Sequence, residues 1–206
     1  MLLRQNENAL DSGPNAMKVV ATEFDRLVVV EPTVYRDARG YLLETWNESR
    51  FAAEGMPGPM VQDNLSWSAQ GVLRGLHFQN PNSQAKLVMV LQGEIFDVAV
   101  DVRRGSPTFA NWFGIRLSAD NQRQVYIPIG FAHGFCVLSE SALVSYKCSE
   151  TYRPETEMTI LWCDARLAID WPISGPTVSS KDATAPRFDE IPPDRLPTWR
   201  PAAASR

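Results

Sequence analysis

The segment 86–102, KLVMVLQGEIFDVAVDV, carries the strongest structural signal in the chain. Apolar and β-branched residues fill both halves of this segment, and Gln92-Gly93 separates them. Runs of this length and composition favour strands over helices, and a glycine-containing pair between two such runs is typical of a tight turn. We therefore expect two strands here, joined as a β-hairpin.

Short apolar runs separated by turn signals continue on both sides of this segment. Toward the C-terminus they are NWFGIRL (111–117) and QVYIPI (124–129), expected to form a second hairpin, then GFAHGFCVL (130–138), ALVSYKCSETY (142–152), TILWCD (159–164) and LAIDW (167–171). Toward the N-terminus, LVVVEPTVY (27–35), the turn 37–40 and YLLETW (41–46) predict strand, turn and strand. So many short strands predict an all-β fold, either an antiparallel sandwich or a closed barrel.

The ends of the chain differ from this pattern. Residues 1–16 are polar and turn-rich, and we expect them to form a flexible lead, with Met17 as a second candidate start. We assign 17–195 to one domain and 196–206 to a C-terminal tail. Helical signal is confined to NESRFAAEG (47–55), and the many prolines after Pro172 favour a segment that wraps the surface.

Composition limits the class of protein. The 206 residues, 44% hydrophobic and 21% charged, suffice for one domain with a full core. A net charge of −4 gives no broad attraction for nucleic acid or anionic membranes. No apolar run approaches the roughly 20 residues of a membrane-spanning helix, and no signal peptide is evident, so we expect a cytoplasmic protein. Cys136, Cys148 and Cys163 lie in apolar runs without CxxC spacing, which predicts buried, reduced thiols.

The chain has two histidines, His77 in VLRGLHFQ and His133 in IPIGFAHGF. A metal-binding β-barrel of the cupin type needs about three imidazoles and a carboxylate around the ion. Position 79, on the same strand face as His77, is a glutamine, so we expect no metal site. The patterns GxSxG, GxGxxG and GxxxxGK[ST] are absent as well, and we expect no serine nucleophile and no organic cofactor.

His77, Tyr146 and Lys86 remain as candidates for chemistry. An imidazole with a pKa of about 6.5 can take a proton from a carbon next to a carbonyl, and a phenol with a pKa of about 10 can donate one. A lysine ammonium can stabilise the resulting enolate oxygen. These side chains suit proton transfer at carbon, although histidine and tyrosine in strands are often packing residues.

Longer motifs resemble a known family. They are VLRGLHFQNPNSQAKLVMVLQGEIFDVAVDVRRGSPTF, IPIGFAHGF, YKCSETYRPETEMTILWCD, LAIDWP and SSKDATAP, in this order. From about Val19 to Pro192 the chain is similar to the dTDP-4-dehydrorhamnose 3,5-epimerases. The resemblance implies a cupin-like β jelly roll, a homodimer, a dTDP-sugar substrate and no cofactor. The implied reaction inverts C3 and C5 of dTDP-4-dehydro-6-deoxyglucose.

The same resemblance implies roles for particular residues. His77 is the general base, held by Asp182 of SSKDATAP, and Tyr146 is the general acid. A carboxylate that fixes the tautomer of a catalytic histidine is sound chemistry. The residues implied to line the nucleotide-sugar site are Arg39, Glu44, Gln62, Asp63, Asn64, Arg74, Lys86, His133, Glu157 and Lys181. The four basic side chains at 39, 74, 86 and 181 would supply positive charge for a diphosphate.

Two residues depart from the family pattern. Ile129 in IPIGF replaces the usual glutamate, and Leu42 in RGYLLE replaces a frequent phenylalanine. Neither is a presumed proton-transfer group, but both can alter the pocket. Two rival functions stay open: a mono-epimerase that inverts only C3 or C5, and a catalytically silent cupin that binds sugar nucleotides.

Overall fold

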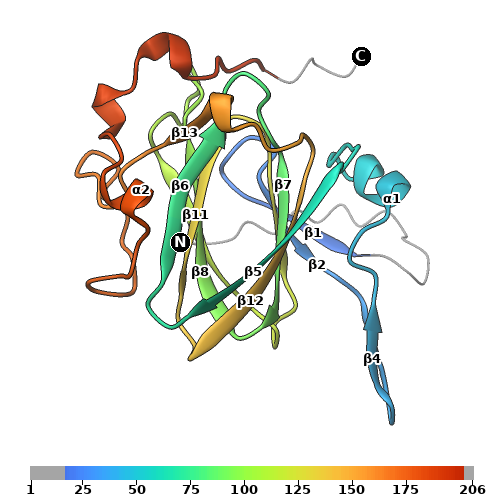
Figure 1. The fold of residues 1–206 in the computed structure, drawn as a ribbon. Coiled ribbons are helices and arrows are strands. Elements are labelled where there is room, and N and C mark those ends of the chain that lie inside the picture. The colour runs from blue at the N-terminus through green and yellow to red at the C-terminus, as the bar shows by residue number, and fades with distance from the viewer. Residues whose placement is uncertain (1–16, 202–206) are drawn as a thin grey trace.

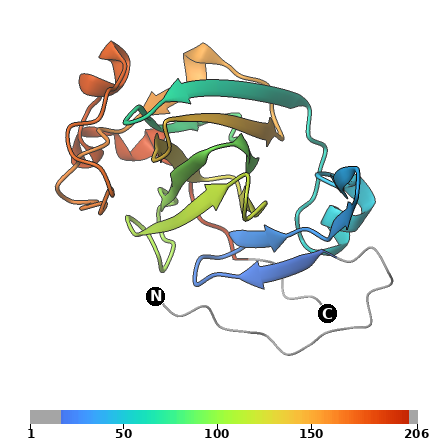
Figure 2. The same ribbon diagram turned by 90° about the horizontal axis from the view of Figure 1, so that it is seen from below.

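Two antiparallel β-sheets face each other in the computed structural model, which describes residues 17–201 (Figure 1). The first sheet contains, in spatial order, β1 (Lys18–Ala21), β2 (Val28–Glu31), β10 (Gln124–Ile127), β7 (Lys86–Gln92), β12 (Ser141–Cys148) and β5 (Gln62–Ala69). The second contains β13 (Glu157–Thr159), β6 (Leu73–Gln79), β11 (Phe131–Val137), β8 (Glu94–Asp101) and β9 (Trp112–Ser118). Figure 2 shows the first sheet strand by strand, from teal β5 to blue β1. The predicted all-β jelly-roll architecture is confirmed.

The prediction of a hairpin at Gln92-Gly93 is wrong. β7 pairs with β10 and β12 in the first sheet, whereas β8 pairs with β11 and β9 in the second. The turn therefore carries the chain from one sheet to the other. Both strands have an apolar face. Placing the strands in facing sheets buries these faces against each other more completely than a two-stranded ribbon could.

The second expected hairpin fails for the same reason. β9 and β10 lie in opposite sheets, and so do β11 and β12. By contrast, the predicted strand, turn and strand around 37–40 is confirmed: β3 (Val34–Asp37) pairs with β4 (Gly40–Leu43). This ribbon projects away from the two sheets (Figure 1). The predicted run LAIDW forms no strand, because Leu167 instead packs into the outer core from a loop.

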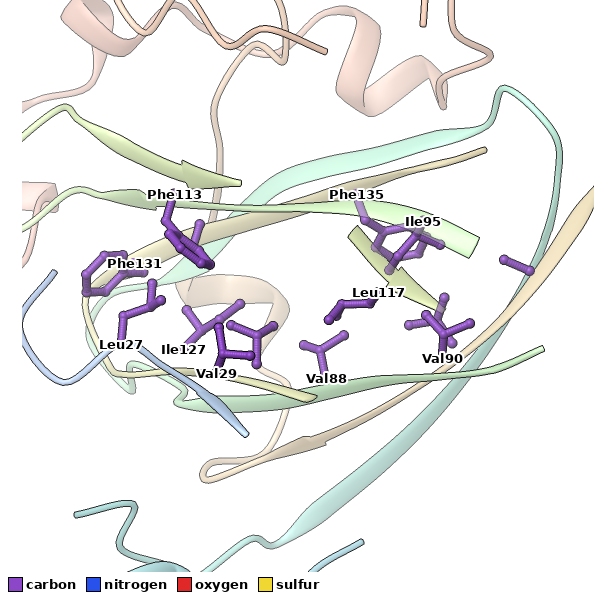
Figure 3. Packing of buried hydrophobic residues seen from close by; sticks show 14 of the residues in the cluster. Leu27, Val29, Val88, Val90, Ile95, Phe113, Leu117, Ile127, Phe131 and Phe135 are labelled. Atoms are coloured by element: carbon purple, nitrogen blue, oxygen red, sulfur yellow. The ribbon is translucent and has the colours of Figure 1, made fainter. Parts of the chain in front are cut away.

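The main core fills the space between the sheets. Val88 and Val90 from the first sheet meet Ile95, Phe131 and Phe135 from the second (Figure 3). Each large apolar side chain buried in this way contributes about 1.5–3 kcal/mol. The alternation of side chains along each strand thus decides which half of its residues enters this core.

A second core covers the outer face of the second sheet. Leu76, Val98 and Ala132 pack there against Phe188 and Ile191 of the C-terminal segment. That segment contains α2 (Ser180–Ala183) and the 3-10 helices Phe188–Glu190 and Pro193–Arg195, while a further 3-10 helix spans Pro154–Thr156. The expected wrapping segment is therefore present, and it adds a third layer beside the sandwich (Figure 1).

Several smaller expectations can now be compared with the structure. The predicted helix is present as α1 (Glu48–Ala53). Cys136 and Cys148 are buried and free, but Cys163 is exposed, so the prediction of a third buried thiol is wrong; it lies on a loop after β13, where local apolar composition does not imply burial. The expected lead 1–16 lies outside the described residues. Among 17–201, no helix has the length and apolarity needed to cross a bilayer.

Gly93 at the sheet-crossing turn provides a test of the fold. Its φ is +78°, and an added Cβ would lie 2.1 Å from the Ser141 carbonyl oxygen. Gly71 has a similar φ of +75° but nothing within 4 Å of its hypothetical Cβ. We expect Gly71→Ala to cost about 1–2 kcal/mol from backbone strain, and Gly93→Ala to cost about 1–3 kcal/mol more because the turn must move. Urea denaturation measures both; equal losses would contradict the close approach.

Candidate active site

A cavity of ≈ 300 Å³, which we call the His77 pocket, opens where β5, β6, β7 and β12 come together. Its walls combine side chains from both sheets. They are Gln62, Asn64, His77, Phe78, Gln79, Gln84, Lys86, Tyr146, Cys148, Tyr152 and Glu157. The pocket therefore brings together the three side chains that the sequence singles out for proton transfer.

His77 is fixed by a buried carboxylate. Its Nε2 lies 2.7 Å from Oδ1 of Asp182, whose other oxygen accepts a hydrogen bond from the Gly75 backbone N–H at 3.4 Å. Asp182 lies on α2, where its backbone N–H donates to the N-capping hydroxyl of Ser179. A carboxylate can only accept, so Nε2 carries the proton and Nδ1 retains the lone pair. His77 is thus oriented to act as a base through Nδ1.

The protonation state of Asp182 supports this arrangement. Burial by itself would raise the pKa of Asp182, which is 3% exposed. The hydrogen bond and charge of His77, with the Gly75 and Ser179 contacts, outweigh burial and hold this pKa below its ordinary value. The carboxyl group is therefore ionised at neutral pH and stabilises positive charge on the imidazole.

Tyr146 enters the pocket from the sheet opposite His77. It lies on β12, in register with Asn64 of β5 and Val88 of β7. Burial chiefly raises the pKa of its phenol, Cys148 adds to that effect, and Arg74 opposes it. No residue in 17–201 hydrogen-bonds the hydroxyl in the structure. Tyr146 is therefore a protonated donor at neutral pH, available to a ligand.

Lys86 supplies a buried positive charge. It is 8% exposed, and its Nζ donates to Oε1 of Gln84 at 3.2 Å. Burial lowers the pKa of Lys86, while Cys148 and Glu157 raise it. An ammonium that is poorly solvated interacts strongly with any negative charge that develops nearby.

Glu157 links the rim of the pocket to α2. It accepts a hydrogen bond from the Tyr152 hydroxyl at 2.8 Å and forms an ion pair with Lys181 at 2.5 Å. Burial raises the pKa of Glu157, but the contacts with Lys181 and Tyr152 lower it by more. The pKa of Glu157 therefore lies below its ordinary value. Because Lys181 precedes Asp182, this ion pair also helps to hold the helix that orients His77.

Four implied site residues lie near the pocket but do not line it; one of them is Lys181, which pairs with Glu157. Asp63 points to the opposite face of β5 from its neighbours at 62 and 64 and pairs with Lys147 at 2.9 Å. Arg74 donates to the Ser68 hydroxyl at 3.0 Å. His133 is the cross-strand partner of His77, but it is buried and lies 2.8 Å from Asp97 Oδ2.

Two others lie on or beside the β3–β4 ribbon. Arg39 is at its tip and forms an ion pair with Asp37, while Glu44 accepts from Arg50. Neither residue lines the His77 pocket of its own chain. Ile129 and Leu42, which depart from the family pattern, are exposed and also lie outside this pocket.

Some lining residues were not among the candidates predicted from the sequence. Cys148 lies two residues after Tyr146 on β12, so strand alternation alone could have placed it on the same face. Gln84 lies two residues before Lys86 and could have been found in the same way. Tyr152 has no such signal, because it follows β12 on a loop whose path only the tertiary structure defines.

No cluster of three or more His, Cys, Asp or Glu side chains suited to a metal ion occurs within the described part of the chain. Gln79, at the position where a second histidine would be needed, instead bonds the carbonyl oxygens of Asn82 and Thr151 and the N–H of Arg153. Its amide is therefore committed to holding two loops in place.

Comparison with known proteins identifies relatives over most of the chain. Residues 21–190 match the family model described as dTDP-4-dehydrorhamnose 3,5-epimerase. The protein of that name from Pseudomonas aeruginosa is 51% identical over a match that covers 84% of this chain and 96% of the relative. The one from Methanothermobacter thermautotrophicus is also 51% identical, over 76% of this chain and 84% of the relative. The dTDP-6-deoxy-D-glucose-3,5-epimerase of Legionella pneumophila, solved with dTDP-4-keto-L-rhamnose, has a TM-score of 0.88 at 47% identity, covering 90% of this chain and all of that one.

The Asp182 carboxylate generates a pH-dependent prediction. The pKa of Asp182 is lower in the folded state than in the unfolded chain, where it is about 4. The carboxylate therefore stabilises the fold fully above about pH 4, and this stabilisation is lost as the pH falls through the folded-state pKa. We expect Asp182→Asn to cost about 1.5–3 kcal/mol at neutral pH, and the difference from wild type to shrink below about pH 4. Urea unfolding at a series of pH values measures this, with Asp120→Asn, an exposed carboxylate, as the control. A difference that is independent of pH would refute the charged pair.

Proposed function

This chain belongs to the dTDP-4-dehydrorhamnose 3,5-epimerase family, and we propose that His77 and Tyr146 perform its chemistry as general base and general acid. The protein is an epimerase of dTDP-bound sugars in dTDP-rhamnose biosynthesis. One observation above all supports the residue roles: an oriented imidazole and a protonated phenol line the same cavity from opposite sheets. Inversion at carbon requires just such an arrangement, because a proton must leave one face and return to the other.

The substrate is dTDP-4-dehydro-6-deoxy-α-D-glucose and the product is dTDP-4-dehydro-β-L-rhamnose. The ketone at C4 makes the C–H bonds at C3 and C5 acidic. Nδ1 of His77 removes each proton, and the electron pair moves into an enolate whose oxygen lies near the Lys86 ammonium. A proton returns to the opposite face, from Tyr146 in at least one case, and proton exchange with solvent restores the neutral imidazole and the phenol before the next inversion. The ketone itself supplies the acidity, so this route uses neither a metal nor an organic cofactor.

Basic and amide side chains around the pocket suit the nucleotide part of the substrate. Arg74 and Lys181 lie beside it and would pair with the diphosphate, while Gln62 and Asn64 offer hydrogen bonds from β5. We assign His133 a supporting role behind His77, because its own ring is held by Asp97. Reduced cysteines at 136 and 148 agree with a cytoplasmic location.

We further propose that two copies of the chain form a homodimer. Leu65 and Trp67 on the edge strand β5 are 64% and 62% exposed, and Leu91 on β7 is 44% exposed. An apolar face on an unpaired edge strand is a typical contact surface. The exposed β3–β4 ribbon can then carry Arg39 and Glu44 to the pocket of the second copy. A dimer thus accounts for implied site residues that do not line the pocket of their own chain.

Hydrogen exchange at C3 and C5 in D₂O, followed by NMR with EDTA present, tests the acid and base roles. We expect His77→Asn to reduce exchange at both carbons by about 10²- to 10⁴-fold, because no other base replaces the ring. Tyr146→Phe keeps the ring packing and removes only the hydroxyl. In that variant exchange should persist, since an enolate can be reprotonated from the same face, whereas inversion should fall sharply.

Other results would revise this assignment. Near-normal exchange in His77→Asn would remove the histidine from the role of base, and wild-type inversion in Tyr146→Phe would leave the tyrosine as a packing residue. Exchange confined to C3 or to C5 in the wild type would favour a mono-epimerase. Loss of wild-type activity in EDTA, restored by one metal ion per chain, would require a metal-dependent route.

Complementation between two inactive variants tests the dimer. Arg39→Ala and His77→Asn should each be folded and poorly active. If Arg39 serves the partner's pocket, a mixed dimer has one intact pocket, and random mixing should restore about a quarter of wild-type activity. Size-exclusion chromatography verifies the assembly state. If the mixture is no more active than the separate variants, Arg39 does not act across the interface.

A further inference from the structure

A second cavity, of ≈ 540 Å³, is larger than the His77 pocket and shares none of its lining residues. Loops at the ends of several strands surround it: the β1–β2, β6–β7 and β10–β11 loops, the residues after β8, and the C-terminal segment 194–200. Four arginines line this cavity, Arg26, Arg103, Arg104 and Arg200, against a single acidic residue, Asp194. We call it the arginine cavity.

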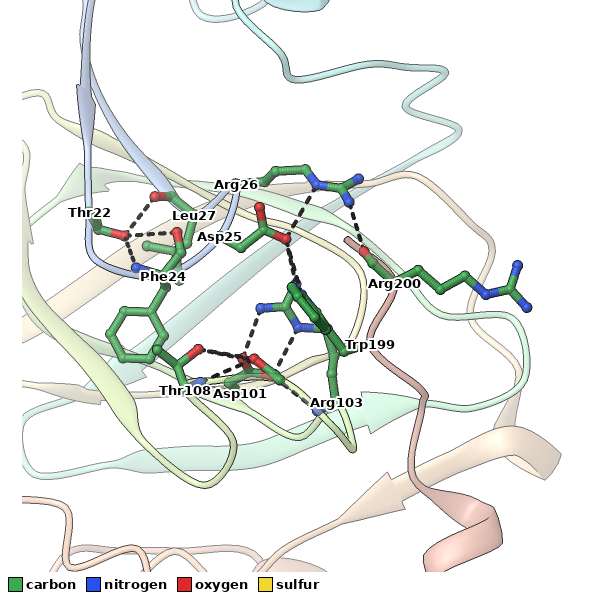
Figure 4. A network of polar contacts seen from close by, with 11 residues as sticks. Thr22, Phe24, Asp25, Arg26, Leu27, Asp101, Arg103, Thr108, Trp199 and Arg200 are labelled. Carbon is green, nitrogen blue, oxygen red and sulfur yellow. Dashed lines mark hydrogen bonds and ion pairs between the residues drawn. The ribbon is translucent and has the colours of Figure 1, made fainter. Parts of the chain in front are cut away.

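Two of these arginines are neutralised by neighbouring carboxylates. Arg103 is buried and bonds Asp101 at 2.8 Å and Asp25 at 3.3 Å, and Arg26 lies 3.5 Å from Asp25. Figure 4 shows this network together with Trp199, whose indole N–H donates to Asp25. These charges hold the wall of the cavity in place and add little net potential.

Arg104 and Arg200 differ, since neither forms an ion pair with any carboxylate in 17–201. The Arg104 guanidinium donates to the Thr198 hydroxyl at 3.3 Å, and the Arg200 side chain points away from the network in Figure 4. In a protein whose net charge is −4, two unpaired guanidinium groups at one cavity are a local excess of positive charge. Guanidinium groups bind phosphate oxygens in pairs of parallel hydrogen bonds.

The rest of the wall combines apolar side chains with the polar residues Asn80, Ser83, Asp194 and Thr198. Pro128, Ile129, Leu196 and Pro197 line it, and Ile129 is 55% exposed, so its side chain is available to a ligand. A cavity of this size that combines an apolar wall with a few charged donors has the properties of a small-molecule site. Its chemistry fits an anion that also carries an apolar or planar group.

We propose that the arginine cavity is an accessory binding site for a small phosphorylated metabolite with two or more negative charges. The phosphate groups bind Arg104 and Arg200, and the remainder of the ligand contacts Ile129 and the adjoining prolines. The site is distinct from the His77 pocket, because the two cavities share no lining residue.

Titration of the full-length protein with inorganic pyrophosphate, followed by calorimetry and tryptophan fluorescence, tests the phosphate part of this proposal. We expect saturable binding that weakens with added NaCl and perturbs Trp199, so that Trp199→Phe loses most of the fluorescence change but retains the heat of binding. The double variant Arg104→Ala/Arg200→Ala should bind at least about tenfold more weakly. Arg116→Ala/Arg123→Ala removes the same charge from two ion-paired arginines elsewhere and should bind as wild type does.

A second pair of variants changes only the charge at the mouth of the cavity. Ile129→Glu introduces a carboxylate near the arginines, whereas Ile129→Gln has nearly the same shape without the charge. We expect the glutamate variant to bind pyrophosphate much more weakly than the glutamine variant. The proposal fails if pyrophosphate does not bind saturably, if the arginine double variant binds like its control, or if the two Ile129 variants bind equally.

Discussion

The burial of the inner faces of two β-sheets against each other is the constraint on which the rest of this structure depends. It makes the turn at Gly93 cross between sheets, so that β7 and β8 find partners far away in the sequence. It also places β6 opposite β12 and β5, and therefore sets His77 against Tyr146 across one cavity. The acid and base roles proposed for these two groups require rigid supports on opposite sides of the substrate, and a packed sandwich provides them.

The C-terminal segment contributes both to stability and to chemistry. Its apolar residues, including Phe188 and Ile191, cover the outer face of the second sheet and contribute to the second core. The same segment carries α2, which presents Asp182 to His77. Because the helix is held by packing and by the Lys181–Glu157 ion pair, the orientation of the base depends on the docking of the whole segment. Docking of the outer layer and orientation of the His77 ring are thus coupled.

Charge is distributed unevenly over this acidic protein. At the end of β8, Asp101 accepts hydrogen bonds from Arg103, Ser106 and Thr108; burial raises its pKa, but these contacts outweigh burial and keep the pKa below its ordinary value. This network, with Trp199, fastens residues 196–200 to the sheets, since Trp199 and Arg104 also share a backbone hydrogen bond. The unpaired arginines nearby then stand on a rigid support, which favours selective binding of an anion.

The sequence by itself determined the composition of the strands, the turn at 37–40, the helix at 48–53 and the three side chains capable of proton transfer, because alternation, turn residues and side-chain pKa values are local properties. Resemblance between motifs added the family and the expectation that Asp182 holds His77, a contact that the structure contains. Only the tertiary structure decided which strands pair, which face of β5 meets the pocket, that Tyr152 lines it, and that Cys163 is exposed. Alternation specifies which face of a strand is buried but not which strand lies next to it; that choice is made by the burial of all apolar faces at once.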